Sequence, residues 1–279
     1  MTRLGADLEA AIVAARSEPR PGGLVAVSVP TTLEPEAVFA AASARKETAC
    51  FWDATASDAV RHEIVAGAGE ALRIETGGEG RFGVVERAAR DLFGRLTVAR
   101  GARGARVRPR LLGSFTFAPS REAGVPWSSP GATFVLPRVT IVARPGEART
   151  LTLVLRGEEL SRPDTAARDV ADLLAPRPPV SKRQRAARVL EDGAAAFVRA
   201  VEDALVAIER DDLAKVVLAR RSRVVGVPPV DSVVRGLAPA PGAVRFALGF
   251  DGATFFGASP ELLASVEGDT IRTEALAGS

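Results

Sequence analysis

The sequence has 279 residues, of which 47% are hydrophobic and 25% are charged, and its formal net charge is +3 at pH 7. These values are typical of a globular protein with one large domain or two small ones. They exclude a membrane-spanning helix, since no apolar run approaches the roughly 20 residues that one needs. Because Cys50 and His62 are the only cysteine and histidine, an internal disulfide bond and a Cys/His zinc site are excluded too.

The N-terminus lacks the basic region and the long apolar core of a signal peptide. We therefore expect a cytoplasmic protein with no membrane partner. Five arginines between positions 100 and 110 form a basic run, but the run is rich in glycine and has no interleaved aromatic residues. A solvated connecting loop explains it better than a nucleic-acid surface, so we expect no nucleic-acid partner.

In chain order, hydrophobic periodicity first predicts helices at 8–16, 83–96 and 164–174, and strands at 24–30, 48–53, 111–118, 132–143 and 151–155. Pro176-Arg-Pro-Pro179 then interrupts the pattern and opens a polar segment. We predict that 1–175 forms the first region of the fold and that 176–185 is a linker.

Beyond the linker, 186–279 has a different pattern. A helix is predicted at 192–210, and strands at 215–225, 244–250, 253–258, 262–266 and from 270 onward. Asp251-Gly252 and Gly268-Asp269 lie between apolar runs and are typical of tight hairpin turns. The pattern predicts an antiparallel meander that is entered from a helix.

Two short motifs suggest other enzyme classes but are incomplete. Gly67-Ala-Gly69 begins like a dinucleotide-binding loop, yet the third glycine is missing because Leu72 stands in its place. Gly257-Ala-Ser259-Pro-Glu261 resembles a nucleophile elbow, but its last position is glutamate rather than glycine.

The segment Leu213-Ala-Lys215-Val-Val-Leu-Ala-Arg220 carries the first candidate for catalysis. Only three of the 37 basic residues are lysine, and Lys215 is the one that begins an apolar, strand-like run. Burial would favour its neutral amine, which can act as a base where arginine cannot. The pattern alone nevertheless favours a lysine that points into solvent at the start of a strand.

The segment Phe255-Phe-Gly-Ala-Ser-Pro-Glu261 carries the second candidate. Pro260 keeps Ser259 extended, so Glu261 lies at a junction between two apolar runs. A buried carboxyl group at such a junction could serve as a general acid. On the pattern alone, a capping or ion-paired glutamate is the better interpretation.

Taken with a third segment, Thr273-Glu-Ala-Leu-Ala277-Gly278-Ser279, these stretches resemble the chorismate-binding enzyme family. That family includes isochorismate, salicylate, anthranilate and aminodeoxychorismate synthases. Lys215 precedes Glu261 by 46 residues, and Ser279 follows Glu261 by 18, which agrees with the family's spacing. Trp127 and Phe134-Val-Leu-Pro-Arg138 also resemble isochorismate synthases. The resemblance implies an α+β fold of the anthranilate synthase component I type, with stacked antiparallel sheets flanked by helices.

Two positions favour isochorismate synthase within this family. Ammonia-using members usually carry glutamine in place of Lys215, and one type of aminodeoxychorismate synthase carries a catalytic lysine in place of Ala277. The resemblance thus implies that water adds at C2 of chorismate while the C4 hydroxyl leaves, for menaquinone or catecholate siderophore synthesis. It implies Lys215 as the base, Glu261 as the acid, and Ala277, Gly278 and Ser279 as substrate-binding residues.

The resemblance also sets expectations about cofactor and partners. We expect a monomer that uses chorismate and Mg²⁺ without a glutaminase subunit. The magnesium ligands are expected beyond residue 279, because the family's metal-binding glutamates lie in a C-terminal third that we expect this chain to lack. Two alternatives stay open: a salicylate synthase, which begins with the same hydration, and an inactive fragment.

Overall fold

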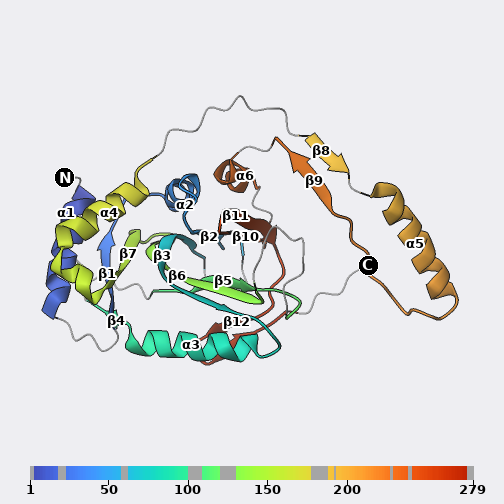
Figure 1. Ribbon diagram of the computed structural model, residues 1–279, viewed down its shortest axis with the longest axis horizontal. Coiled ribbons are helices and arrows are strands. Elements are labelled where there is room, and N and C mark those ends of the chain that lie inside the picture. Colours follow the sequence, from blue (N-terminus) through green and yellow to red (C-terminus); the bar gives the residue numbers. More distant parts are fainter. Residues whose placement is uncertain are drawn as a thin grey trace. The chain divides into compact units, whose positions relative to one another are not determined.

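The computed structural model describes residues 3–17, 23–57, 62–99, 109–119, 130–176, 188–191, 193–226, 229–237 and 241–274 (Figure 1). The chain divides into two compact units, of which the first comprises Met1–Arg177 and Val230–Ser279 and the second Pro178–Pro229. The predicted division into 1–175, 176–185 and 186–279 was made by sequence pattern, whereas these units are defined by their internal contacts. The division stays a prediction.

The first unit is built on a nine-stranded mixed sheet. Its strands are β1 (Leu24–Pro30), β2 (Ala49–Asp53), β3 (Ile64–Thr76), β4 (Thr97–Val98), β5 (Leu112–Phe115), β6 (Ala132–Ala143), β7 (Thr150–Arg156), β10 (Val244–Phe250) and β11 (Ala253–Ser259). The order is β11-β10-β2-β3-β6-β7-β1-β4, and β5 pairs with β6 beside this path. The strands pair antiparallel except for β1 and β4, which are parallel.

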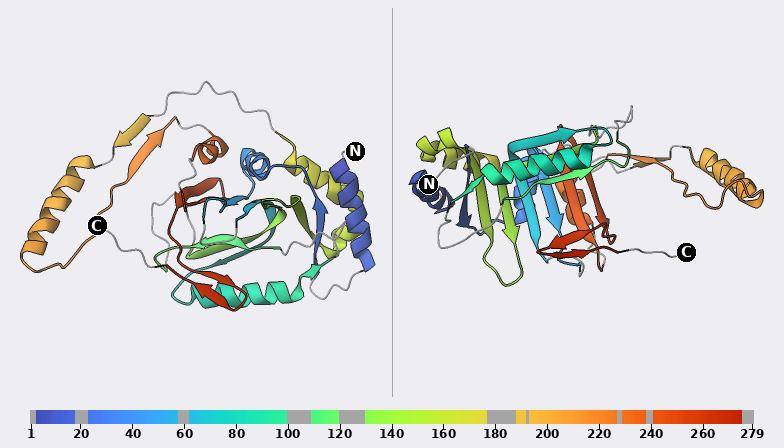
Figure 2. Two further views of the ribbon diagram at one scale, coloured as in Figure 1. Left: turned by 180° about the vertical axis from the view of Figure 1, so that it is seen from behind. Right: turned by 90° about the horizontal axis from the view of Figure 1, so that it is seen from below.

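Helices cover both faces of this sheet, which confirms the predicted α+β class. The longest, α3 (Arg81–Arg95), lies against one face (Figures 1 and 2). The other face is covered by α1 (Arg3–Ala14), α2 (Pro35–Ala44), α4 (Pro163–Leu174) and α6 (Val230–Gly236). Two 3₁₀ helices, η1 (Ala15–Ser17) and η3 (Gly157–Ser161), follow α1 and β7. In the part of the chain that the structure describes, no helix is long and apolar enough to cross a membrane.

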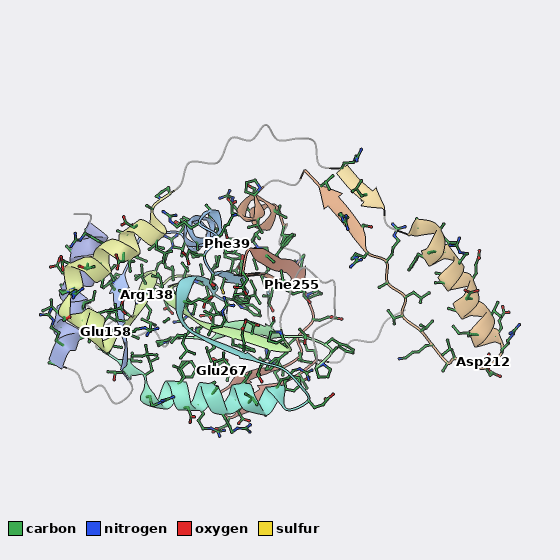
Figure 3. All side chains as sticks on the ribbon, in the orientation of Figure 1. Phe39, Arg138, Glu158, Asp212, Phe255 and Glu267 are labelled. Carbon is green, nitrogen blue, oxygen red and sulfur yellow. The ribbon has the colours of Figure 1, made fainter. Side chains whose placement is uncertain are left out.

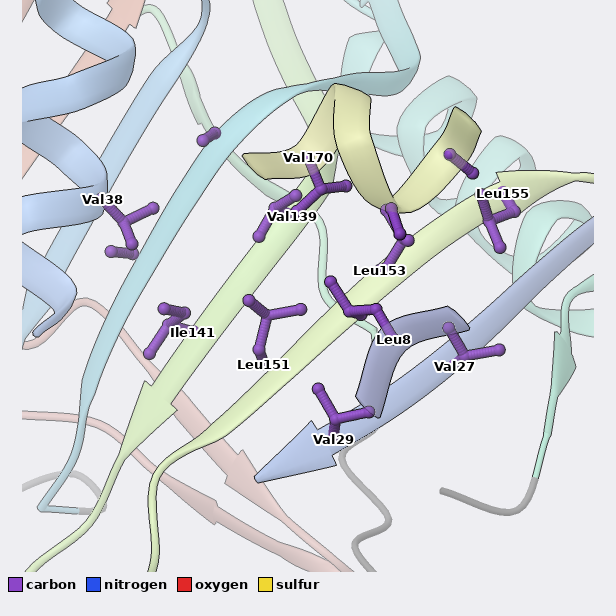
Figure 4. Close-up of a cluster of buried hydrophobic side chains, with 14 of the residues drawn as sticks. Leu8, Val27, Val29, Val38, Val139, Ile141, Leu151, Leu153, Leu155 and Val170 are labelled. Atoms are coloured by element: carbon purple, nitrogen blue, oxygen red, sulfur yellow. The ribbon is translucent and has the colours of Figure 1, made fainter. Parts of the chain in front are cut away.

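Strand alternation creates the main core. Val25, Val27 and Val29 of β1 point toward α1 and α4, and all three are almost completely buried. Figure 4 shows Leu8 of α1 and the leucines of β7 near Val27 and Val29. Burial of a valine or leucine side chain contributes about 1.5–3 kcal/mol, so this face stabilises most of the first unit.

A bulge in β3 bends the sheet. The register between β3 and β6 shifts between Glu70 and Leu72, so that one extra residue stands on β3. Beyond the bend, Val135 of β6 packs in one cluster with Cys50 of β2 and Phe250 of β10. The sheet therefore curls over the face that carries Cys50.

The second unit contains α5 (Ala194–Glu209) between β8 (Arg188–Glu191) and β9 (Ser222–Val225), which pair antiparallel. The strand predicted at 215–225 is therefore wrong in its first part, because the chain from 213 to 221 has no regular structure. An alternating apolar pattern forms a strand only beside a partner, and within the described residues this stretch has no ladder partner.

The predicted C-terminal meander is split between two sheets. β10 and β11 join the large sheet, whereas β12 (Ser265–Glu267) and β13 (Thr270–Arg272) form a separate hairpin. Both predicted turns are confirmed. Gly252 and Gly268 adopt φ values of +82° and +59° there, a region that glycine enters without steric cost.

Candidate functional site

Glu261 lies in a short irregular segment between β11 and β12. Its backbone N–H donates a hydrogen bond of 3.3 Å to the hydroxyl of Ser259. Farther along, the hydroxyl of Thr273 donates to the carbonyl oxygen of Leu263 over 2.9 Å. Two hydroxyl groups thus fix the backbone on either side of Glu261. Its own side chain is exposed to solvent.

The hairpin that carries this segment is anchored through β10. Phe246 of β10 and Phe255 of β11 face each other with ring centroids 5.4 Å apart, and Figure 3 shows Phe255 on β11. On the other face, Arg245 binds the buried Asp53 of β2 with Nε 3.0 Å from Oδ2. Desolvation opposes ionisation of Asp53, but hydrogen bonds from Thr55 and from Arg245 lower its pKa below the ordinary value.

The turn of the same hairpin is tied to the bent strand β3. Arg73 donates to Asp251 over 2.9 Å and also pairs with Glu70, which accepts a further hydrogen bond from Thr48. Although desolvation opposes it, bonding to Arg73 and Thr48 holds the pKa of Glu70 below its ordinary value. These contacts fix the hairpin as part of the large sheet. The sequence analysis predicted neither these contacts nor the pair of Arg245 with Asp53. For that pair, a charged residue within an apolar strand was a signal for a buried partner.

Lys215 lies in the irregular stretch 213–221 of the second unit, whereas Glu261 belongs to the first unit. Every residue of this stretch is exposed, and Val217 beside Lys215 is 92% exposed. The solvent-exposed interpretation of Lys215 therefore agrees with the structure. Its apolar neighbours are exposed as well, and the catalytic role of Lys215 stays a prediction.

Ala277, Gly278 and Ser279, the predicted substrate-binding residues, lie outside the described residues, and so does Trp127. The roles of all five predicted site residues, Lys215 and Glu261 included, stay predictions.

The described residues do not fit a magnesium site. Among them, no group of three or more His, Cys, Asp or Glu side chains could hold a metal ion. The buried carboxylates are engaged by arginine instead. Glu63, for example, accepts hydrogen bonds from Arg110 and Arg144 at 3.0 and 3.1 Å. Despite opposing desolvation, these bonds lower the pKa of Glu63, and an arginine-paired carboxylate is not a ready metal ligand.

An apolar pocket of about 350 Å³ lies where β5 curls over β2 and β10. Trp52, Phe134 and Phe246 contribute aromatic rings to its wall, and Cys50 lies beneath them. Burial, with a smaller effect of nearby Glu70, raises the pKa of the Cys50 thiol to about 12. The thiol is therefore neutral at physiological pH and unsuited to nucleophilic chemistry.

Comparisons with known proteins agree with this fold. The family model described as "Chorismate binding enzyme" matches residues 10–279. The solved structure of the menaquinone-specific isochorismate synthase MenF from Escherichia coli is 19% identical with a TM-score of 0.56, and the match covers 92% of this chain and 56% of that one. A putative 2,3-dihydroxybenzoate-specific isochorismate synthase, DhbC from Bacillus anthracis, is 16% identical with a TM-score of 0.48, over 81% and 48% of the two chains. No curated protein matches the sequence. The chain thus spans about half the length of these solved relatives, and MenF supports the predicted fold.

Proposed function

This chain belongs to the family of chorismate-binding enzymes, and we propose that it is part of an isochorismate synthase. Such an enzyme adds water at C2 of chorismate and removes the C4 hydroxyl. The observation that carries the proposal is Lys215, which stands where the ammonia-using members of the family usually carry glutamine. Ala277 supports it, because one type of aminodeoxychorismate synthase carries a catalytic lysine there.

Lys215 is proposed as the base that takes a proton from water. The role needs the neutral amine, which burial favours, and the side chain is exposed in the chain described here. We therefore assign the role to a state in which 213–221 is covered. The apolar side chains of Val216, Val217 and Leu218 give such a cover something to pack against.

Glu261 is proposed as the acid that protonates the departing C4 hydroxyl. The hydrogen bonds of Ser259 and Thr273 hold the backbone of the segment that carries it, which supports the proposal. An acid and a base on opposite faces of the ring allow water to enter while the hydroxyl leaves. Ala277, Gly278 and Ser279 are proposed to contact the substrate.

Magnesium enters this proposal through the resemblance alone. The described residues offer no site for it, so its ligands are expected beyond residue 279, and no step is assigned to the metal. We further propose that the enzyme acts as a cytoplasmic monomer without a glutaminase subunit, in menaquinone or catecholate siderophore synthesis.

The test is product analysis. The protein expressed from its complete reading frame is incubated with chorismate and Mg²⁺, with and without ammonium, and the products are separated by chromatography. Isochorismate that forms independently of ammonium is the expected result. Salicylate with pyruvate would favour the salicylate synthase, whereas anthranilate or aminodeoxychorismate would contradict the choice of water as nucleophile. Absence of any product would favour a fragment without catalysis of its own.

A further inference from the structure

A cleft of about 520 Å³ lies in the first unit between the C-terminal end of α3 and the start of β1. Its size falls within the range of about 300–1,000 Å³ that is typical of small-molecule sites. None of its residues has a part in the proposed reaction. Figure 3 shows one of them, Glu158, on the side of this unit where α1 and α4 lie.

The floor of the cleft is apolar. Leu92 of α3 is 5% exposed and packs in a small cluster with Ala26, Leu136 and Val154. Side chains packed against this cluster are only partly buried and line the cleft, namely Leu24, Ala71, Leu72 and Leu96. Ala71 is the extra residue of the bulge in β3, and bulges often lie next to binding sites. The floor suits a hydrophobic body.

The rim of the cleft is cationic. Arg95 comes from the last turn of α3 and Arg156 from the end of β7. Among the described residues neither is in direct ion-pair contact with a carboxylate, although the charge of Arg156 helps to lower the pKa of nearby Glu159. The Nε of Arg95 donates to the carbonyl oxygen of Asp91 over 3.1 Å, which leaves its two terminal amino groups for another acceptor. Among the described residues that line the cleft, Glu158 is the only acidic one, so the two guanidinium groups there leave an excess of positive charge. The neighbouring Glu159 pairs with Arg138.

We propose that this cleft binds a small amphipathic carboxylate, with its hydrophobic body on the leucine floor and its carboxylate at the arginine rim. Arginine is suited to this task because its planar fork of N–H donors matches the two oxygens of a carboxylate. The C-terminal end of α3 opposes an anion through its partial negative charge. The binding of an anion therefore depends on both arginines.

The experiment compares two probes of nearly the same shape on the protein expressed from its complete reading frame. Titration calorimetry measures the binding of 2-naphthoate and of the neutral 2-naphthamide, to the wild type and to Arg95→Gln and Arg156→Gln. We expect each variant to weaken 2-naphthoate binding by about 1.5-fold to fivefold, the range for exposed charge pairs, and to leave 2-naphthamide binding unchanged. Arg87→Gln, on an exposed part of α3 outside the cleft, is the matched control and should bind as the wild type does.

Hydrogen exchange with 2-naphthoate present locates the site. Protection confined to the end of α3 and to the β7–η3 junction is expected. Equal affinity for the two probes, an equal loss in Arg87→Gln, no binding of 2-naphthoate, or protection only around Trp52 and Phe246 would each overturn the proposal. Because no turnover of chorismate is measured, failure here is separate from failure of the proposed function.

Discussion

At the scale of single residues, the proposed role of Lys215 needs a side chain that can give up its proton. Arginine keeps the positive charge but cannot be deprotonated near neutral pH. We therefore expect Lys215→Arg to lower kcat nearly as much as Lys215→Ala, by about 10²-fold or more if the lysine is a general base. Arg221→Lys, on the same exposed stretch, should leave kcat unchanged. Activity of Lys215→Arg within a few-fold of the wild type would instead indicate an electrostatic role.

The proposed role of Glu261 makes a different demand, because the acid must donate a proton rather than hold the substrate. Glutamine keeps the shape but has no such proton. Glu261→Gln should therefore lower kcat by about 10²–10⁴-fold with little change in KM for chorismate. Asp269→Asn, in the turn between β12 and β13, is the matched control and should behave as the wild type does. A large rise in KM with kcat intact would make Glu261 a binding residue.

These two residues also show what sequence can tell about the site. Residue type and spacing were enough to single out Lys215 and Glu261. The pattern also favoured a solvent-exposed Lys215, as the structure has it. It could not show what packs over either side chain in the active enzyme, since burial depends on more than the neighbours in sequence. Arg245 within an apolar strand indicated a buried partner, but nothing in the sequence identified that partner as Asp53, 192 positions away.

At the scale of elements, two glycines that sequence does not distinguish should respond in opposite ways to a methyl group. A Cβ on Gly113 of β5 would lie 2.1 Å from the carbonyl oxygen of Thr133 on β6, so β5 would have to move away. A Cβ on Gly94 of α3 would meet nothing within 4 Å, and alanine favours a helix more than glycine does.

We expect Gly113→Ala to lower the free energy of unfolding by about 1–3 kcal/mol, as overpacking does, and Gly94→Ala to raise it by about 0.5–1 kcal/mol. Urea denaturation followed by circular dichroism measures both. Equal stability of Gly113→Ala and the wild type would mean that the pairing of β5 with β6 contributes little to the fold.

Elements with strong periodicity were predictable, and those that depend on distant partners were not. The strand predicted at 24–30 agrees with β1, and that at 132–143 agrees with β6. No element was predicted over β3, whose sequence contains Gly67 and Gly69. In the structure Gly67 is required by close packing, since a Cβ there would lie 2.6 Å from Cγ of Pro137. The stretch 213–221 is the reverse case: a strand was predicted over most of it, but among the described residues it has no partner strand and no regular structure.

At the scale of the whole molecule, arginine-paired carboxylates should set how stability depends on pH. The pKa values of Asp53 and Glu63 are lowered from ordinary values of 3.8 and 4.5. A carboxyl group whose pKa is lowered by folding binds fewer protons in the folded state. Its stabilising contribution is complete at a pH above its ordinary, unfolded-state pKa. The contribution is lost as the pH falls through the lower pKa of the folded state. We therefore expect the free energy of unfolding to fall as the pH drops below about 4.5, and chemical denaturation at several pH values measures it.

The variant Asp53→Asn tests how much the ion pair of Asp53 with Arg245 contributes to the loss of stability at low pH. Removing one partner of a buried pair leaves Arg245 without its counter-charge, so the variant should lose about 3–5 kcal/mol at pH 7. It should lose less stability than the wild type on acidification. Asp164→Asn removes an exposed pair with Arg168 on α4 and should change the pH profile little. A wild-type stability that stays constant down to pH 3 would contradict the argument.

Stability should also differ between the two units of the 279-residue chain, and α4 and α5 offer a comparison of helix with helix. α4 buries Ala166, Ala167 and Val170 against the main core. No residue of α5 is buried, and Leu205 on it is 55% exposed. An isolated helix of this length is only marginally stable in water, and local opening is easiest where few apolar contacts are made.

We expect the backbone amides of α5 to exchange with deuterium orders of magnitude faster than those of α4, β1 and β7, with the unit 1 strands slowest of all. Hydrogen exchange with mass spectrometry on the 279-residue chain measures this, and a dilution series separates intramolecular protection from protection by a second copy. Protection of α5 that equals that of α4 at every concentration would mean that the apolar face of α5 is covered within the chain, and that the second unit has a core of its own.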